Sequence, residues 1–263
     1  MSDVVLFERR GPVALLTLNR PDRLNAWTGE LGERYYDLLD ECAGDPDVRV
    51  IVVTGAGRGF CAGADMEDLQ GIGGAQRDDV VSAAKPSRPV YHATTLPKIV
   101  IAAVNGACAG LGFVHALMCD IRFAAEGAKF TSAFSRRGLI AEWGSSWVLP
   151  RLVGPARAMD VLASARVFLA EEAHEMGVVN RVLAPEELLD ETLAYATDLA
   201  TNVSPASMAV IKRQIWDDYG RSLPEAHEES VRLMFESFTR PDMKEGVMSF
   251  VEKRPPDFPP YQP

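Results

Sequence analysis

The sequence contains few cysteines, and none of them is spaced for metal binding or thiol redox chemistry. Its 263 residues include four cysteines, no two of which form a C-x-x-C pair. The spacing excludes a zinc ribbon and a thioredoxin-like motif, and we expect no metal site and no disulfide. All four are most simply interpreted as small buried residues: Cys42, Cys61, Cys108 and Cys119.

Long apolar runs and an excess of basic charge are also missing. No stretch approaches the roughly 18 consecutive apolar residues of a membrane span, and the N-terminal segment MSDVVLFERRG lacks a signal-peptide pattern. We therefore predict a cytoplasmic protein with no membrane partner. The formal net charge is -10, with 37 acidic and 27 basic residues, and the basic residues are scattered. This balance argues against nucleic acid as a partner.

The hydrophobic pattern begins with alternating strands and helices and ends with helices alone. With 47% hydrophobic residues, the chain can form one large domain and an appended helical region. We predict an α/β core over residues 1–200 and a helical oligomerisation region over residues 201–263. Apolar, β-branched runs predict strands at Val4–Arg9, Val13–Asn19, Val48–Thr54, Ile99–Val104 and Ile121–Ala125.

Helical periodicity, with prolines at several helix starts, predicts most of the remaining structure. The weakly patterned segment Glu67–Ser87 is expected to hold a helix within a mobile surface segment that could cover a pocket. The ending PPDFPPYQP is expected to be extended. The predicted helices are Thr28–Ala43, Ala109–Met118, Pro155–Ser164, Ala170–Met176, Pro185–Asn202, Pro205–Tyr219, Leu223–Thr239 and Pro241–Lys253.

Two glycine-containing segments follow predicted buried strands. They are GFCAGAD, over Gly59–Asp65, and NGACAGLG, over Asn105–Gly112. Two tight turns in one site can direct two backbone N–H groups at one oxygen, and losing one such donor costs roughly 3 to 4 kcal/mol of transition-state stabilisation. The pair therefore predicts an oxyanion hole, whereas either segment alone is explained as an ordinary turn.

Several longer motifs, in order, closely resemble the crotonase, or enoyl-CoA hydratase/isomerase, superfamily. They are LNRPDRLNA (Leu18–Ala26), VRVIVVTGAGRGFCAGADM (Val48–Met66), IAAVNGACAGLGFVHALMCDIRFA (Ile101–Ala124) and GLIAEWGSSWVLPRLVG (Gly138–Gly154). The resemblance implies a crotonase-like spiral of ββα units with a C-terminal helical trimerisation region. It also implies a homotrimer, or a hexamer built as a dimer of trimers.

The same resemblance implies an acyl-CoA thioester as substrate, with coenzyme A entering as part of it and no separate cofactor. The thioester oxygen would accept hydrogen bonds from the backbone N–H groups of Ala64, after Gly63, and Leu111, after Gly110. Many relatives have glycine at the position of Leu111, but only its amide is needed. The expected CoA-binding residues are Arg23, Arg58, Ala62 and Lys253, and each of the three cations is equally explained as an exposed surface charge.

The residues that would transfer protons differ from those of a hydratase. Enoyl-CoA hydratases resemble one another in using two glutamates, and Val114 and Phe134 occupy those positions here. One carboxylate, Glu142 in GLIAEWGSS, stands where isomerases of the superfamily carry Glu or Asp. Its apolar neighbours, Trp143 among them, are expected to raise its pKa. Val114, Phe134 and Trp143 are the expected acyl-pocket residues, although the aromatic ones are also explained as core.

Two other polar residues near these motifs have simpler explanations than catalysis. His115 follows Val114 on the predicted helix and is therefore rotated by about 100° from its face, which favours a core histidine. Asp65 is expected to fix the turn next to Ala64 through backbone hydrogen bonds.

Three functional hypotheses remain open from the sequence. The leading one is a Δ3,Δ2-enoyl-CoA isomerase in which Glu142 moves a single proton. The second is a 2-enoyl-CoA hydratase in which Glu142 alone orients the water. The third is a catalytically weak acyl-CoA-binding protein, in which Glu142 is a solvated loop carboxylate.

Overall fold

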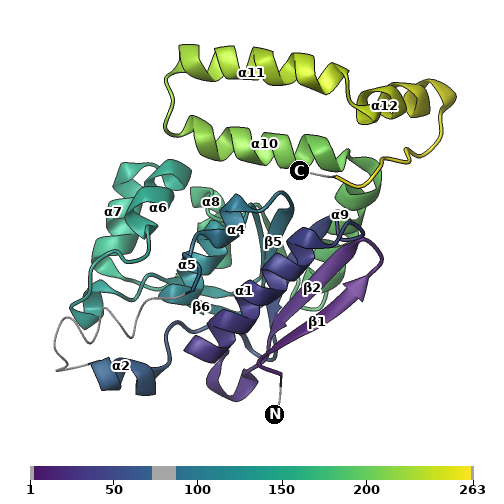
Figure 1. Cartoon of the computed structure of the whole chain (residues 1–263). Coiled ribbons are helices and arrows are strands. Elements are labelled where there is room, and N and C mark those ends of the chain that lie inside the picture. The colour runs from purple at the N-terminus through teal and green to yellow at the C-terminus, as the bar shows by residue number, and fades with distance from the viewer. Residues whose placement is uncertain (1–2, 73–86, 262–263) are drawn as a thin grey trace.

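The computed structural model describes residues 3–72 and 87–261, and its centre is a six-stranded sheet (Figure 1). The strand order is β1-β2-β3-β5-β7-β10; β1 and β2 form an antiparallel hairpin and every other pair is parallel. Its strands are β1 (Val5–Arg10), β2 (Val13–Leu18), β3 (Val50–Gly55), β5 (Ile99–Val104), β7 (Ile121–Ala125) and β10 (Arg181–Leu183).

A second, smaller sheet has the order β4-β6-β8-β9, with only β8 and β9 antiparallel. Its strands are β4 (Gly59–Cys61), β6 (Ala107–Ala109), β8 (Lys129–Thr131) and β9 (Phe168–Leu169). Each of β4, β6 and β8 directly follows a strand of the large sheet, and a helical segment comes next. This repetition is the predicted spiral of ββα units.

The helices of the core pack around both sheets. Thr28 starts the first long helix as predicted, because its side chain accepts a hydrogen bond from the Leu31 N–H. The helices are α1 (Gly29–Gly44), α2 (Met66–Ile72), α4 (His92–Thr95), α5 (Leu111–Met118), α6 (Ser145–Val153), α7 (Pro155–Ser164), α8 (Ala170–Met176) and α9 (Leu188–Asn202), with short 3-10 turns at Pro21–Arg23 and Ser135–Arg137.

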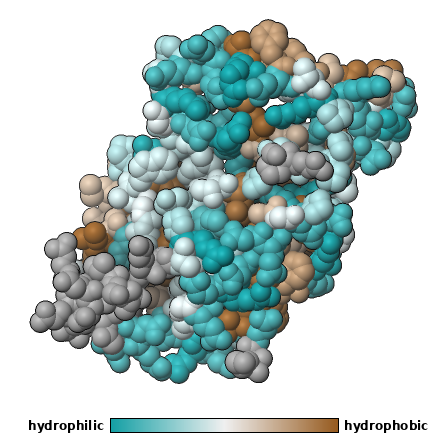
Figure 2. All heavy atoms as spheres, viewed as in Figure 1, coloured by the Kyte–Doolittle hydropathy of each residue, from teal (hydrophilic) through white to brown (hydrophobic). Residues whose placement is uncertain are grey.

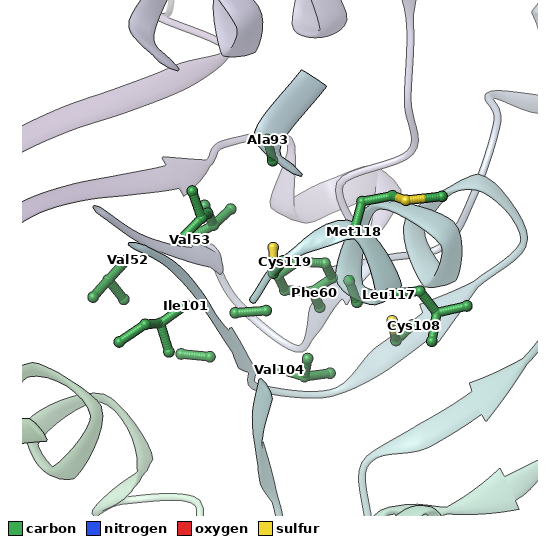
Figure 3. Packing of buried hydrophobic residues seen from close by; sticks show 14 of the residues in the cluster. Val52, Val53, Phe60, Ala93, Ile101, Val104, Cys108, Leu117, Met118 and Cys119 are labelled. Carbon is green, nitrogen blue, oxygen red and sulfur yellow. The ribbon is translucent and has the colours of Figure 1, made fainter. Parts of the chain in front are cut away.

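The main hydrophobic core lies between the strands and the helices α1, α5 and α9. All residues of β3 are buried, as its apolar sequence predicts for a strand covered on both faces. Figure 3 shows Phe60 of β4 and Cys108 of β6 close to Leu117 of α5. All four cysteines are buried and free, as predicted. The core therefore supports the turns that follow β4 and β6.

The C-terminal helices α10 (Pro205–Asp218), α11 (Leu223–Phe238) and α12 (Pro241–Glu252) lie at the top of Figure 1. Helix α10 lies against α4 and β5, whereas α11 and α12 lie apart from both sheets. Helix α10 is tied to the core by the buried Lys212, whose Nζ donates to the Ala93 and Lys98 carbonyls and lies 2.7 Å from Asp120 Oδ2. Apolar side chains remain exposed on α11 and α12 (Figure 2). The tail thus packs on its own core and still leaves an apolar surface.

Some predicted boundaries were wrong. The helix expected from Ala109 begins at Leu111, because residues 107–109 form β6, and the helix expected from Pro185 begins at Leu188. Of the segment 67–87, residues 73–86 lie outside the described part of the chain, and α2 covers its start. The predicted division into a core and a helical region stays a prediction; residue 200 lies in the last turn of α9. Among the described helices, none is long and apolar enough to cross a membrane.

Candidate active site

The two glycine-containing turns lie against each other. A β-carbon added to Gly63 would lie 3.7 Å from the Gly110 Cα atom, and one added to Gly110 would lie 3.9 Å from the Gly63 Cα atom. Both residues have positive φ, +100° at Gly63 and +51° at Gly110. Glycine adopts these angles at little cost, which explains its use at both turns.

The two predicted donor amides are unused within the described chain. Leu111 is the first residue of α5, after the N-cap Gly110, so its N–H has no partner inside the helix. No backbone acceptor in residues 3–72 and 87–261 takes the N–H of Ala64 or Leu111. Both residues are half-buried. Each amide is therefore available for a ligand atom.

The Ala64 turn is held from both sides. The Trp27 N–H donates to the Gly63 carbonyl at 2.7 Å, and the Asp65 N–H donates to the Trp27 carbonyl at 2.9 Å. The Asp65 carboxylate accepts from the Glu67 N–H at 3.1 Å, which is the turn-fixing role predicted for it. This bond, with the nearby Arg20 guanidinium, lowers the pKa of Asp65. Asp65 is thus ionised and already engaged in structure.

Two asparagines fix the loop between β3 and β4. The buried Asn25 donates to the Gly59 carbonyl at 2.7 Å and accepts from the Arg20 N–H at 2.8 Å. Asn105 donates to the Gly55 carbonyl at 2.8 Å from the start of the second glycine segment. The Asn105 bond ties the second glycine segment to the end of β3, and the Asn25 bonds tie the start of the first segment to the turn after β2.

Glu142 lies in the loop before α6 and is half-buried. Burial raises its pKa, in the predicted direction, and outweighs a smaller opposite effect of Trp143. Trp143 has a φ of +56° and Gly144 one of +81°. Positive φ costs about 1–3 kcal/mol for a residue such as tryptophan and persists where the surroundings impose it. The chain therefore accepts local strain directly beside its candidate acid/base.

The predicted acyl-pocket residues have different surroundings. Phe134 is buried, and its Cε1 atom would lie 3.9 Å from a β-carbon added to Gly110. Val114 is fully buried on α5, while Trp143 is 39% exposed. Ile140, another apolar neighbour of Glu142 in the sequence, is 80% exposed. Phe134 thus adjoins the glycine turns, Val114 lies within the helix packing, and Trp143 lies at the surface.

The predicted CoA-binding residues do not all lie together. Arg23 is exposed and forms an ion pair with Glu67, and Arg58 is exposed beside the first glycine segment. The Ala62 N–H donates to the Leu24 carbonyl at 3.0 Å, so a ligand can meet only the Ala62 carbonyl. Lys253 is the residue that follows α12, and α12 lies at the opposite end of the molecule from α2 in Figure 1. Within one chain, Lys253 is not brought to the other three.

Sequence reasoning missed Trp27 and Arg20, which contact the donor turn. Arg20 lies in the LNRPDRLNA motif, so its position next to the first glycine segment could have been inferred from that resemblance. Trp27 carried no comparable signal, because a tryptophan after a turn is most simply a core residue. Among the described residues, no cluster of histidine, cysteine, aspartate and glutamate is suited to bind a metal ion.

Comparison with known proteins places this geometry in a family. The family model for enoyl-CoA hydratase/isomerase matches residues 8–260. A 1,2-epoxyphenylacetyl-CoA isomerase from Escherichia coli K12 is 38% identical, with 98% of this chain and 99% of that protein covered. A probable enoyl-CoA hydratase/isomerase from Mycobacterium abscessus has a crystal structure that superposes with a TM-score of 0.89 at 36% identity, covering 98% of this chain and 99% of the other. An enoyl-CoA hydratase from Mycobacterium marinum is 51% identical, with a TM-score of 0.71, over 84% of this chain and all of that one (100%). The chain belongs to the enoyl-CoA hydratase/isomerase family and has its crotonase fold.

Proposed function

We propose that this protein isomerises enoyl-CoA thioesters by moving one proton through a thioester enolate. Glu142 takes a proton from the α-carbon of a 3-enoyl-CoA and returns it to the γ-carbon, which moves the double bond to the 2-position. The observation that carries this proposal is the distribution of carboxylates. Glu142 is half-buried with a raised pKa, whereas the resemblance to hydratases assigns the positions of their two glutamates to Val114 and Phe134.

The two free amides supply the other half of the reaction. Removing the α-proton places negative charge on the thioester oxygen, and fixed N–H donors from Ala64 and Leu111 would stabilise that charge more than they stabilise the neutral substrate. The start of α5 adds the favourable helix dipole at Leu111. The α-carbon is then acidic enough for a carboxylate of raised pKa to act as the base.

Hydration makes heavier demands on the site. It requires a positioned water, a group that takes a proton from it and a group that protonates the α-carbon. Asp65 does not fill the missing role, because Arg20 and the Glu67 N–H already engage its carboxylate. The names of the relatives are divided between isomerase and probable hydratase. Of the two carboxylates Asp65 and Glu142, only Glu142 is left to move a proton, which supports the isomerase.

The deciding experiment compares Glu142→Gln with the wild type on a 3-enoyl-CoA and on crotonyl-CoA. We expect isomerisation in the wild type, a loss of about 100-fold or more in kcat in the variant, and no hydration of crotonyl-CoA by either. The matched control is Glu175→Gln, which changes an exposed glutamate on α8. An undiminished isomerisation rate in Glu142→Gln would overturn the proposal.

Each competing hypothesis has its own signature in the same experiment. Loss of the enone absorbance of crotonyl-CoA, abolished by Glu142→Gln, would identify a hydratase with one acid/base. Tight binding of both thioesters with no turnover would identify an acyl-CoA-binding protein.

A further inference from the structure

Trp27 sets the direction of the first predicted donor. Its N–H and carbonyl bond to Gly63 and Asp65, the neighbours of Ala64 on either side. Peptide groups alternate in direction along extended backbone, so the Ala64 N–H faces away from Trp27. A shift of Trp27 would therefore turn the Ala64 amide.

The side chain of Trp27 reaches the helix of the second donor. Its indole stacks on the His115 imidazole, with ring centroids 3.8 Å apart and an interplanar angle of 17°. Both side chains are buried. His115 lies about one helical turn from Leu111 on α5. One flat contact thus joins the segment that orients Ala64 to the helix that begins at Leu111.

The stack is enclosed, so it cannot slide freely. The Tyr35 ring meets both rings edge-on, with centroids 5.5 Å from Trp27 and 5.6 Å from His115. Helix α1 approaches the indole closely at Gly32, where an added β-carbon would lie 2.9 Å from Trp27 Nε1. Tight packing of this kind transmits displacement instead of absorbing it.

His115 acts here through its shape and not through its hydrogen bonds. Its Nε2 atom is buried and has no hydrogen-bond partner in the described part of the chain. Burial also lowers the pKa of His115 to about 3, so the ring is neutral near pH 7. A neutral imidazole with a buried, unpartnered nitrogen contributes a flat ring face, which another aromatic ring can supply.

We propose that Trp27 and His115 are positioning residues that hold the Ala64 and Leu111 amides at the separation that lets both bind one thioester oxygen. The inference rests on the proposed function, because it assigns both amides to that oxygen. Neither side chain needs to touch the substrate. Removing the stack should weaken transition-state stabilisation more than ground-state binding.

The test measures kcat and KM for a 3-enoyl-CoA in Trp27→Ala, His115→Ala and His115→Phe. It also records the absorbance of bound 4-(dimethylamino)cinnamoyl-CoA, a chromophore that shifts to longer wavelength when its carbonyl oxygen accepts hydrogen bonds. The control is Phe123→Leu, which perturbs a buried ring on β7 that packs against Tyr195. Thermal unfolding of each variant identifies effects that follow from stability alone.

We expect the alanine variants to lose about 10- to 100-fold in kcat, with KM changed less than about threefold, since small misplacements of catalytic groups cost this much. They should also lose most of the red shift, while His115→Phe retains both properties. If His115→Phe does not fold, Trp27→Phe serves the same purpose, because it also keeps an aromatic ring in the stack. Folded His115→Ala with wild-type kcat and full red shift would overturn the inference, as would equal kcat losses in Phe123→Leu.

The chromophore does not need Glu142, so the two proposals can fail separately. A red shift that depends on the stack, combined with an undiminished rate in Glu142→Gln, would refute the isomerase mechanism and support the positioning role. An inactive Glu142→Gln variant, combined with a red shift that does not depend on the stack, would support the isomerase mechanism and refute the positioning role.

Discussion

Arg20 and Asp65 form an ion pair beside the first predicted donor, with a guanidinium nitrogen 2.9 Å from the carboxylate Oδ2. Asp65 is 5% exposed, and Arg20 also donates to the Ala26 carbonyl at 2.5 Å. The pair therefore joins the turn after β2 to the residue that follows Ala64.

Removing this carboxylate should affect both folding and catalysis. We expect Asp65→Ala to lower the free energy of unfolding by about 1–3 kcal/mol, because buried groups lose their partners, and to lower kcat. The amide side chain introduced by Asp65→Asn can still accept a hydrogen bond from the Glu67 N–H. Both the free energy of unfolding and kcat of this variant should therefore lie between those of the wild type and Asp65→Ala. Urea unfolding and initial rates measure the two effects. Asp47→Ala, which removes an exposed partner of Arg9, is the control; equal losses there would contradict the prediction.

The positive φ angles at the glycine turns give a second prediction. In Gly63→Ala the new β-carbon would lie 3.0 Å from the Ala109 carbonyl oxygen, so the two turns must separate. We expect kcat to fall by about 100-fold or more, as it does when an oxyanion hole loses one donor. Gly11→Ala is the matched control, since it also has positive φ, +59°, but nothing within 4 Å. It should lose stability and keep kcat. Equal kcat values in the two variants would disprove the assignment.

The long strands and helices could be predicted because each has a clear period and sharp ends. Ile99–Val104 and Ile121–Ala125 match β5 and β7 in both bounds. The short strands of the second sheet could not be found this way, because runs of two or three residues hold no period. A turn separates Pro185 from Leu188, where α9 starts. The proline therefore predicted the approximate start of this helix but not its first residue.

In the candidate site too, features set by neighbouring residues could be predicted, whereas contacts between residues distant in sequence could not. Glycines after strands locate Gly63 and Gly110, since such turns depend on the local backbone. The stack of Trp27 on His115 depends on how α1 and α5 pack, and no sequence period connects residues so far apart. The family resemblance supplied Glu142, because a carboxylate in a loop carries little signal of its own.

The raised pKa of Glu142 predicts a shifted pH profile. The carboxylate must be ionised to act as base, so kcat/KM should fall as the pH drops through a value above the ordinary 4.5. Because Trp143 opposes the effect of burial, Trp143→Phe should move the acid limb to higher pH. Rates across the pH range, with enzyme stability checked at each point, measure the limb. An acid limb at or below 4.5 would contradict the prediction.

The apolar surface on the C-terminal helices predicts self-association. Phe235 and Phe250 are 61% and 85% exposed in a single chain. Single exposed apolar residues are common on protein surfaces, but a large apolar patch marks an interaction site. We expect a trimer or hexamer by sedimentation, reduced to smaller species by Phe235→Glu with Phe250→Glu, with little change in circular dichroism. The control is Phe7→Glu, a half-exposed residue of β1. A wild-type monomer at micromolar concentration would contradict the expectation.

The burial of His115 predicts a specific sensitivity to acid. Its pKa is lowered from 6.5 to about 3 in the folded protein, so between those values the unfolded chain binds one proton more than the folded chain. The free energy of unfolding contributed by this residue is therefore complete above pH 6.5. It should fall by about 1.4 kcal/mol for each pH unit below it.

His115→Phe removes the titrating group and keeps the ring against Trp27. Urea unfolding between pH 7 and pH 4.5 should show a shallower loss of stability in this variant than in the wild type. The comparison with His174→Phe controls for general effects of histidine removal, because His174 is exposed on α8. Parallel curves for the wild type and His115→Phe would mean that the imidazole is protonated in the folded state, and that the stack with Trp27 is made by a cation.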